Sequence, residues 1–339
     1  MTTYILGAGT SFHAGYPLLG DLLPELKDWV EKTNSPIVPQ IQMEWLCNRI
    51  AQHFRAGRSG NLEQALTELK RAPRQTVTLA DGTLFYPHLL LADLPSAIAA
   101  FFNARRAIGD AMTYRRLASN VIEPGDAIIT FNYDVAIEKE LAAVGKWDVG
   151  PGYGFPLFPN RNSPVQVIKL HGSTNWMPLV DGHLGFGTYN VEDLHGDRPM
   201  IPDSELQWLG FGGLKDPLLS EGKQLLGGSP RHTLLLPTLA KSFPGRMWSS
   251  LWEQAKKILN RSSRVVVIGY SLPEADERAR NLILGQCHKD AKVVLRCKSR
   301  TPALVGTFNT AGFRELDADA AQDFEKWLDE EASRRSGRD

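Results

Sequence analysis

Short apolar runs rich in β-branched residues are the feature that most constrains the fold of this chain. Six of them are predicted to be strands: Tyr4–Leu6, Asp126–Phe131, Gln166–Leu170, His232–Leu236, Arg264–Ile268 and Lys292–Arg296. They show little alternation of polar and apolar residues, which is typical of strands covered on both faces in a parallel sheet. Helical patterns fill many of the gaps between them, as immediately before Arg264. The sequence therefore predicts an α/β protein with a doubly wound, mostly parallel sheet.

We predict that residues 1–339 form a single domain, in which the other segments of the chain surround this sheet. The expected parts are a Rossmann-like core at 1–18 and 119–317, a helical insertion at 19–118, and a C-terminal helix and tail at 318–339. The insertion has no convincing strand, and Asn61 followed by Gln64 resembles a capping box that opens a helix over Leu62–Lys70. Pro178–Pro230 is rich in glycine, proline and aspartate, which predicts a long loop of the kind that often forms a lid.

Composition narrows the classes of function. Among 339 residues, Lys plus Arg and Asp plus Glu each number 38, so no net field attracts nucleic acid or an anionic membrane. No apolar run reaches the length of about 18 residues that a membrane span needs, and no secretory leader is seen. Cys47, Cys287 and Cys297 form no C-x-x-C pair, and His183 and His195 have no partners at ligand spacing. We therefore expect a cytoplasmic protein without a metal site.

A glycine-containing turn, Gly7-Ala8-Gly9-Thr10-Ser11, follows the first predicted strand. Small residues there let the backbone approach a ligand closely, and backbone N–H groups near a helix N-terminus favour a phosphate. The third glycine of the dinucleotide fingerprint is replaced by Phe12, which disfavours an ordinary dehydrogenase. A tight strand-to-helix turn that needs small residues only for packing is the alternative, and the turn alone does not decide between them.

Polar residues follow two further strands. Asn132-Tyr133-Asp134 comes after Asp126–Phe131, and His171 comes after Gln166–Leu170. In open α/β sheets ligands bind at the carboxyl ends of the strands, so we expect these residues to share one crevice. The alternatives are an Asx turn or helix cap at Asn132 and Asp134, and a structural histidine at a strand end.

Asn132 and His171 suit the cleavage of a nicotinamide-ribose bond. That reaction expels a neutral leaving group from a pyridinium, so it needs orientation and stabilisation of an oxocarbenium ion and no acid on the leaving group. A histidine accepts a proton from water or a ribose hydroxyl near neutral pH, and an asparagine can donate and accept hydrogen bonds together.

A second glycine turn, Gly269-Tyr270-Ser271, follows Arg264–Ile268 and precedes a helix expected to begin near Pro273. This repeat of strand, glycine and hydroxyl predicts a second contact to an anion or a ribose. Asp276 falls in the expected first turn of the helix, where a carboxylate suits the helix dipole, so a structural role there competes with ligand contact.

Together these blocks resemble the sirtuin-like superfamily, specifically its bacterial branch of NAD⁺-consuming antiphage defence proteins. The matching blocks are Gly7–Ser11 with Gly15-Tyr16-Pro17, Thr130–Asp134, Leu170–Ser173 and Gly269–Leu272, in that order. The resemblance implies that Ala8, Gly9, Thr10 and Ser11 hold the phosphates, that Asn132 and Asp134 hold the nicotinamide-ribose side, that His171 is the catalytic base, and that Gly269 and Ser271 contact the adenosine half. It also implies homo-oligomers and NAD⁺ as the substrate.

Two departures separate the chain from the deacetylating sirtuins. It lacks their four zinc-binding cysteines, and Leu18-Leu19-Gly20 stands where they continue with Asp-Phe-Arg. Acetyl-lysine chemistry is therefore disfavoured, and water becomes the expected acceptor. The leading hypothesis is an NAD⁺ glycohydrolase that depletes NAD⁺ in antiphage defence. The alternatives are an ADP-ribosyltransferase and a non-catalytic nucleotide-sensing subunit of a partner such as an ATPase.

Overall fold

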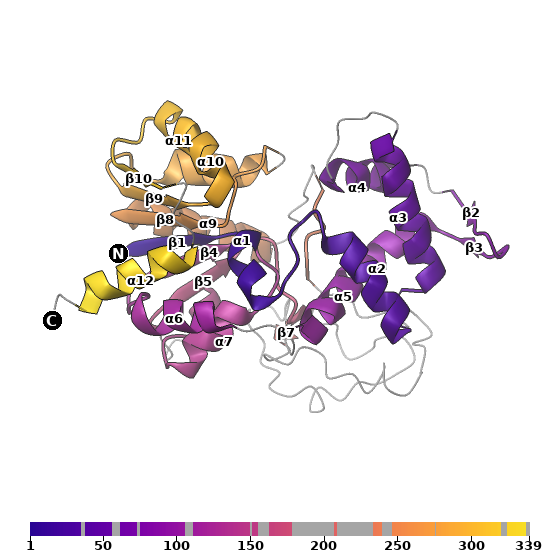
Figure 1. Ribbon diagram of the computed structural model, residues 1–339, viewed down its shortest axis with the longest axis horizontal. Helices are drawn as coiled ribbons and strands as arrows, with labels where there is room; N and C mark the ends of the chain where they lie inside the picture. The colour runs from indigo at the N-terminus through magenta and orange to yellow at the C-terminus, as the bar shows by residue number, and fades with distance from the viewer. Residues whose placement is uncertain are drawn as a thin grey trace.

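The structure is a computed structural model of the 339-residue chain. It describes residues 1–34, 38–55, 62–72, 75–105, 111–149, 151–154, 163–177, 207–208, 233–238, 246–274, 276–319 and 324–336. Two units lie side by side in Figure 1: a sheet flanked by helices, which contains the N-terminus and the last helix, and a separate helical unit. Within the described ranges, no helix has the length and apolar character needed to cross a membrane.

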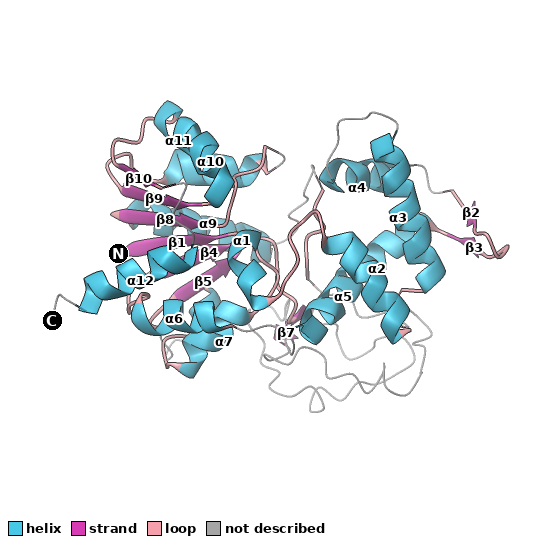
Figure 2. Ribbon diagram, in the orientation of Figure 1, coloured by secondary structure: helices cyan, strands magenta, loops and turns pink. Residues whose placement is uncertain are grey.

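The first unit is built on a six-stranded sheet in the order β10-β9-β8-β1-β4-β5, and all of its neighbours are parallel. The strands are β1 Thr2–Leu6, β4 Ala127–Thr130, β5 Gln166–Lys169, β8 Arg264–Ile268, β9 Lys292–Arg296 and β10 Leu316–Ala318. Tyr4 of β1 lies opposite Ile128 on one side and Val266 on the other. Counted along the chain, the strand order is 3-2-1-4-5-6, which is that of the Rossmann fold. The predicted doubly wound α/β class is confirmed (Figure 2).

The central strands are covered on both faces, as their sequences predict. Ile5, Ile129 and Val266 have no exposed side-chain surface. Branching at Cβ restricts such side chains in a helix but suits the pleated surface of a strand, so these runs are stable in a sheet that helices cover on both sides.

Helices flank the sheet on both sides. They are α6 Met112–Asn120, α7 Ala136–Ala143, α9 Arg246–Arg261, α10 Glu277–Gln286, α11 Thr301–Thr310 and α12 Phe324–Ser336. α6 packs against α7 and α12, and α9 packs against α10 and β5. α9 buries Leu251, Ala255 and Leu259 on one face, which confirms the helical pattern expected before Arg264.

Several short elements complete this unit. They are α1 Ala8–Ser11, the 3-10 helices η1 Phe12–Ala14, η2 Pro151–Tyr153 and η4 Lys298–Arg300, and the antiparallel pair β6 Trp176–Met177 and β7 Gln207–Trp208. Apart from β7, the predicted loop over Pro178–Pro230 lies outside the described residues, and so does its role as a lid.

The helical unit contains α2 Leu22–Thr33, α3 Gln40–Arg55, α4 Leu62–Arg71 and α5 Pro87–Arg105, with an antiparallel hairpin of β2 Val77–Thr78 and β3 Leu84–Phe85. Its helices pack on one another in the pairs α2 with α3 and α5, and α4 with α3 and α5. The hairpin is absent from the sequence-based expectation because its strands are two residues long. Asn61 of the expected capping box lies outside the described residues.

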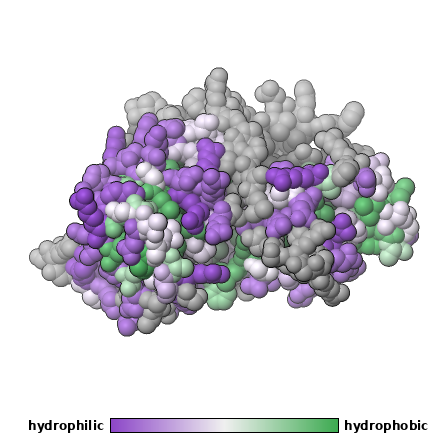
Figure 3. All heavy atoms as spheres, turned by 90° about the horizontal axis from the view of Figure 1, so that it is seen from above, coloured by the Kyte–Doolittle hydropathy of each residue, from purple (hydrophilic) through white to green (hydrophobic). Residues whose placement is uncertain are grey.

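The border of the helical unit is set by packing. The expected insertion 19–118 includes most of α6, yet α6 packs against α7 and α12 beside the sheet. We therefore propose that the helical unit ends with α5. The outer end of this unit carries exposed Leu84, Tyr86 and Leu89, and a green area marks apolar residues at that end of the molecule in Figure 3.

The predicted strand over His232–Leu236 is wrong within the described residues 233–238. Leu234 makes only an isolated antiparallel bridge to Gly172. The Leu235 N–H donates to the carbonyl oxygen of His171 at 3.0 Å, so the segment crosses the end of the sheet rather than joining it. Its leucines are apolar because they cover that end, and β10, whose sequence is Leu-Asp-Ala, is the sixth strand instead.

Candidate active site

A cavity lies at the carboxyl ends of the central strands, with about 860 Å³ of empty space when its opening to solvent is included. Its walls come from the turns after β1, β4, β5 and β8 and from the facing helices α2 and α4. The strand order reverses between β1 and β8, and open α/β sheets bind ligands outside the carboxyl ends of the strands at such a point.

The turns after β1 and β8 touch through their backbones. A Cβ on Gly9 would lie 2.8 Å from the Cα of Gly269, and a Cβ on Gly269 would lie 2.5 Å from the backbone nitrogen of Thr10. Gly269 also has a φ of +61°, in the left-handed region that favours glycine. The glycines thus allow two turns, more than 250 residues apart in sequence, to pack as one.

Several backbone N–H groups of the predicted phosphate-binding turn already donate hydrogen bonds within the protein. The N–H groups of Gly7, Gly9 and Thr10 donate to carbonyl oxygens of β8, of the turn after it and of their own turn, at 2.9–3.0 Å. Of the five residues predicted to bind phosphate, Ala8 and Ser11 line the cavity. The packing role of the glycines, which the sequence left open, is therefore present, and phosphate contact by all five residues stays a prediction.

Asn132, at the end of β4, joins the turn after β4 to the turn after β1. Its Nδ2 donates to the carbonyl oxygen of Gly7 at 2.9 Å and to Oγ of Ser11 at 2.8 Å. The side chain is almost fully buried and lines the cavity. Because the amide nitrogen has two hydrogens and both have partners, the amide oxygen is the part that remains to contact a ligand. This arrangement leaves Asn132 an acceptor to offer a ligand, and its contact with a ligand stays a prediction.

Asp134 also lines the cavity, but its carboxylate is held by the protein. Oδ2 accepts a hydrogen bond from Oγ of Ser11 at 2.6 Å, and Oδ1 accepts one from the backbone N–H of Ala136 at the start of α7. The Asx turn considered for Asp134 is therefore present beside its place in the cavity wall. Tyr114 of α6 completes this network, with its hydroxyl 2.8 Å from Oγ of Ser11.

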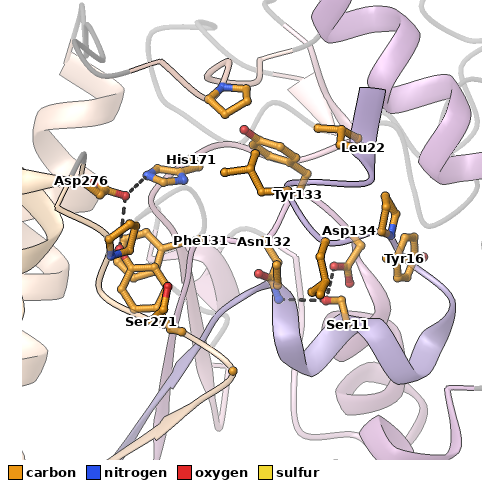
Figure 4. A pocket seen from close by; sticks show the side chains of 18 of the residues that line it. Ser11, Tyr16, Leu22, Phe131, Asn132, Tyr133, Asp134, His171, Ser271 and Asp276 are labelled. Atoms are coloured by element: carbon orange, nitrogen blue, oxygen red, sulfur yellow. Dashed lines mark hydrogen bonds and ion pairs between the residues drawn. The ribbon is translucent and has the colours of Figure 1, made fainter. Parts of the chain in front are cut away.

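His171 follows β5 and faces the cavity from the opposite side (Figure 4). Its turn is fixed by Gly172, which has a φ of +87° and where a Cβ would lie 2.0 Å from the carbonyl oxygen of Thr233. Nε2 of His171 is 2.9 Å from Oδ2 of Asp276, and both side chains are buried. His171 is thus held by the sheet, by the crossing segment at 233–235 and by a carboxylate from the β8 side.

The second glycine turn forms the wall next to His171. Gly269, Tyr270 and Ser271 all line the cavity, as predicted for a ligand-contacting turn. Leu272 follows in a left-handed conformation with a φ of +46°, and a guanidinium hydrogen bond of 2.8 Å from Arg280 holds its carbonyl oxygen. Such strain persists only where the surroundings enforce it, and it clusters at functional sites. The helix α10 begins at Glu277, not near Pro273.

A wholly buried ion pair supports the turn after β4 from behind. Nζ of Lys169 is 2.9 Å from Oε1 of Glu138, and neither side chain has any exposed surface. Lys169 also donates to the carbonyl oxygen of Asp134, and the Tyr153 hydroxyl donates to Oε1 of Glu138 at 3.2 Å. Burial raises the pKa of Glu138 and the nearby ammonium opposes that rise. This pair fixes the backbone that carries Asn132 and Asp134.

The charges that line the cavity are all negative. Glu63 from α4, Asp134 and Asp276 contribute carboxyl groups, and no lysine or arginine is among the described residues of the wall. Burial, reinforced by Asp276, raises the pKa of Tyr133 and of Tyr270, so both phenols stay protonated and act as donors. The electrostatic character of the cavity favours a ligand with a positively charged group.

Comparisons with known proteins show only a limited similarity to solved structures. No family model matches the chain, and no curated protein matches it. Among solved structures, one described as the basis for the mechanism and regulation of Sir2 enzymes has a TM-score of 0.40 and 14% identity over 98% of this chain and 93% of that one. A Sir2 complex with an inhibitor, 2'-O-acetyl-ADP-ribose and a deacetylated p53 peptide has a TM-score of 0.38 and 15% identity over 100% of this chain and 95% of that one. The fold assignment accordingly rests on the strand order itself.

Two carboxyl groups of the site were not assigned to it from the sequence. Glu63 belongs to the helical unit, far along the chain from the strand ends, and no local pattern marks it. The sequence predicts Asp276 in the first turn of a helix, where a structural role competes with ligand contact. Its only sequence signal is its place shortly after Ser271. His183 and His195 lie outside the described residues. Among the residues that the structure describes, no three His, Cys, Asp or Glu side chains are placed to hold a metal ion.

Proposed function

We propose that this chain is an NAD⁺ glycohydrolase that cleaves the bond between nicotinamide and ribose. The observation that carries the proposal is the convergence of Asn132 and His171 with the turns after β1 and β8 on one cavity at the switch point of the sheet. A dinucleotide is the ligand for which this position and these two side chains are suited. NAD⁺ is here the substrate and not a resident cofactor.

The charge of the cavity supports binding of the pyridinium end of NAD⁺ and does not account for binding of its diphosphate. Three carboxyl groups line it, and the nicotinamide ring of NAD⁺ is positively charged until the bond to ribose breaks. In our proposal the nicotinamide-ribose side lies near Asn132 and Asp134, the phosphates lie near Ala8 and Ser11, and the adenosine half lies against Gly269–Ser271. The site needs no metal for this reaction.

The proposed reaction balances as NAD⁺ plus water giving nicotinamide, ADP-ribose and a proton. The bond between C1' of the ribose and N1 of nicotinamide breaks, and both electrons go to the ring nitrogen, which becomes neutral. Water forms the new bond to C1', and His171 takes a proton from that water or from a ribose hydroxyl. The amide oxygen of Asn132 accepts a hydrogen bond from a ribose hydroxyl or the water and holds it in place.

We further propose that the enzyme depletes NAD⁺ in the bacterial cytoplasm as an effector of antiphage defence. Support comes from the resemblance of the four sequence blocks to that branch of sirtuin-like proteins. The same resemblance supports a homo-oligomer and control by a trigger or a partner chain, because unrestrained loss of NAD⁺ kills the host. Cells that carry the wild-type gene should lose NAD⁺ on infection, and cells that carry His171→Ala should not.

The direct test is chromatography of the products formed from NAD⁺ by the purified full-length chain. We expect nicotinamide and free ADP-ribose in equal amounts, and a loss of at least about 100-fold in rate for His171→Ala or Asn132→Ala. His288→Ala is the matched control, because His288 is mostly exposed and lies near Asp290 at 3.7 Å, outside the cavity wall. Wild-type rates in the His171→Ala and Asn132→Ala variants would rule out the proposed site.

The same experiment separates the two alternatives. Label from NAD⁺ that stays on a protein or nucleic acid identifies an ADP-ribosyltransferase, which would use the same cavity. Saturable NAD⁺ binding without turnover, in the presence of the partner chain as well, identifies a nucleotide-sensing subunit.

A further inference from the structure

Asp276 uses its side chain in an unusual way for its position. It is the residue that precedes α10, where an aspartate ordinarily accepts a hydrogen bond from the first helical turn. Its carboxylate makes no such cap and instead places Oδ2 at 2.9 Å from Nε2 of His171 (Figure 4). A cap of this kind typically stabilises a helix by about 1 kcal/mol. Asp276 does not contribute this stabilisation to α10, because its side chain makes no cap hydrogen bond.

Two aromatic rings hold this pair in place. The hydroxyl of Tyr270 donates to the same Oδ2 of Asp276 at 3.2 Å. Phe131 stacks on Tyr270 with ring centroids 4.2 Å apart and meets His171 edge-on at 5.0 Å. Side chains after β4, β5 and β8 thus form one packed cluster, in which neither the imidazole nor the carboxylate can rotate without moving a ring.

The closeness of the carboxylate favours one of the two imidazole tautomers. An ionised carboxylate is an acceptor only, so its charge favours a hydrogen on Nε2, the nitrogen that lies 2.9 Å from it. In a neutral imidazole the other nitrogen then holds the lone pair. We propose that Asp276 is the positioning residue of His171, which fixes the tautomer with Nδ1 as the basic nitrogen and aims it into the cavity. This inference rests on the proposed function, in which His171 is the base.

Among the described residues of the cavity wall, the other ionisable groups are protonated tyrosines and carboxyl groups that make no ion pair with His171. Glu63 of α4 and Asp134, after β4, line the same cavity, and the hydroxyls of Tyr133 and Tyr270 stay protonated. Lys169 on β5 is paired with Glu138 behind the sheet end. Asp276 is therefore the anion placed at hydrogen-bond distance from the imidazole, and its charge stabilises the protonated form of His171.

The test replaces this charge with a neutral group of the same shape. Asp276→Asn keeps an oxygen that can accept from Nε2 and Tyr270, but it removes the anion. We expect His171 to titrate at a pH lower by about one unit or more, measured by NMR of the imidazole C–H resonance, which is assigned from its absence in His171→Ala. The acidic limb of the rate against pH should move the same way, with a maximal rate about 10- to 100-fold lower.

Two further variants make the test specific. Tyr270→Phe removes a donor from Oδ2 and leaves the carboxylate more basic, so His171 should titrate at a slightly higher pH, opposite to Asp276→Asn. Glu277→Gln is the matched control, because it makes the same change one residue along at an exposed position of α10. It should leave the titration, the pH profile and the rate unchanged.

The outcomes separate the inference from the function on which it rests. If the wild type cleaves NAD⁺ and His171→Ala does not, but Asp276→Asn keeps the wild-type rate and pH profile, Asp276 does not position His171. If the wild type does not cleave NAD⁺, the hydrolase proposal fails and the titration alone decides on the pairing of Asp276 with His171. A lower titration pH in folded Asp276→Asn supports the pairing, and an unchanged one overturns it. Should Asp276→Asn fail to fold, the shift in Tyr270→Phe decides in its place, and no shift overturns the inference.

Discussion

Replacing Lys169 with methionine should destabilise the protein far more than a typical single substitution. Lys169 and Glu138 are both wholly buried, with 2.9 Å between Nζ and Oε1. Methionine has a similar length but neither charge nor donor, so Glu138 becomes an unpaired carboxyl group and the carbonyl oxygen of Asp134 loses its donor. Breaking a buried ion pair on one side costs about 3–5 kcal/mol, and we expect that loss in the free energy of unfolding at neutral pH.

The loss should also depend on pH in a defined direction. Burial already raises the pKa of Glu138, and Lys169 opposes that rise, so the pKa rises further in Lys169→Met. A carboxyl group with a folded-state pKa above its unfolded-state value loses stability as the pH rises from the unfolded value to the folded one. The loss is up to about 1.4 kcal/mol per pH unit. Lys169→Met should therefore be closer to the wild type at about pH 5 than at about pH 7.5.

Urea unfolding of the wild type, the single variant and Lys169→Met with Glu138→Gln is the decisive assay. Glutamine removes the unpaired charge but keeps an acceptor for the Tyr153 hydroxyl, which lies 3.2 Å from Glu138. The double variant should recover about half of the loss or more. A single variant that loses less than about 1 kcal/mol at neutral pH, or a double variant less stable than the single one, would refute the reasoning.

Three further predictions concern other parts of the fold. Gly269→Ala should lower the free energy of unfolding by about 1–3 kcal/mol, because φ is +61° and the new Cβ lies 2.5 Å from backbone. Gly285→Ala on α10 is the control. It has open space around it and should be neutral or stabilising in the same urea assay. Burial alone would raise the pKa of Glu331, but hydrogen bonds from arginines, Arg264 foremost, lower it to about 2. Because this folded-state pKa is depressed, up to about 3 kcal/mol of stability should be lost as the pH falls from about 4.5 to about 2, and Glu331→Gln should abolish that dependence in acid titrations of unfolding. Burial raises the pKa of Cys297 to about 11, so mass spectrometry should find it unalkylated at neutral pH until the protein unfolds.

The sequence predicts the sheet well where burial is complete on both faces. The predicted strands Arg264–Ile268 and Lys292–Arg296 have the bounds of β8 and β9, since strands covered by helices leave a continuous apolar signal. β10 at Leu316–Ala318 gives no such signal, because an edge strand is only partly buried and this one contains Asp317. The leucines at 234–236 gave the opposite error, because residues that cover the end of a sheet are as apolar as residues within it.

The site was predictable to the extent that it lies at strand ends. Asn132 and His171 reach the same cavity because parallel strands bring their carboxyl ends together, which a sequence pattern can indicate. The partner of His171 was not predictable in this way. Asp276 has the local pattern of a helix start, and its rotation toward His171 depends on Phe131 and Tyr270, which pack only in the folded protein.

The hydrogen bonds of Asn132 have a consequence for the design of inhibitors. Its amide nitrogen already donates to Gly7 and Ser11, so a compound that reaches this residue meets a carbonyl-type oxygen. A group that donates a hydrogen bond, such as a hydroxyl, an amine or an amide N–H, will be accepted there. Fluorine, an ether or a carboxylate at the same point will face lone pair against lone pair and lose affinity. Under the proposed function, we therefore expect a fluorinated ribose analogue of NAD⁺ to be a weaker scaffold for this cavity than one that keeps both hydroxyls.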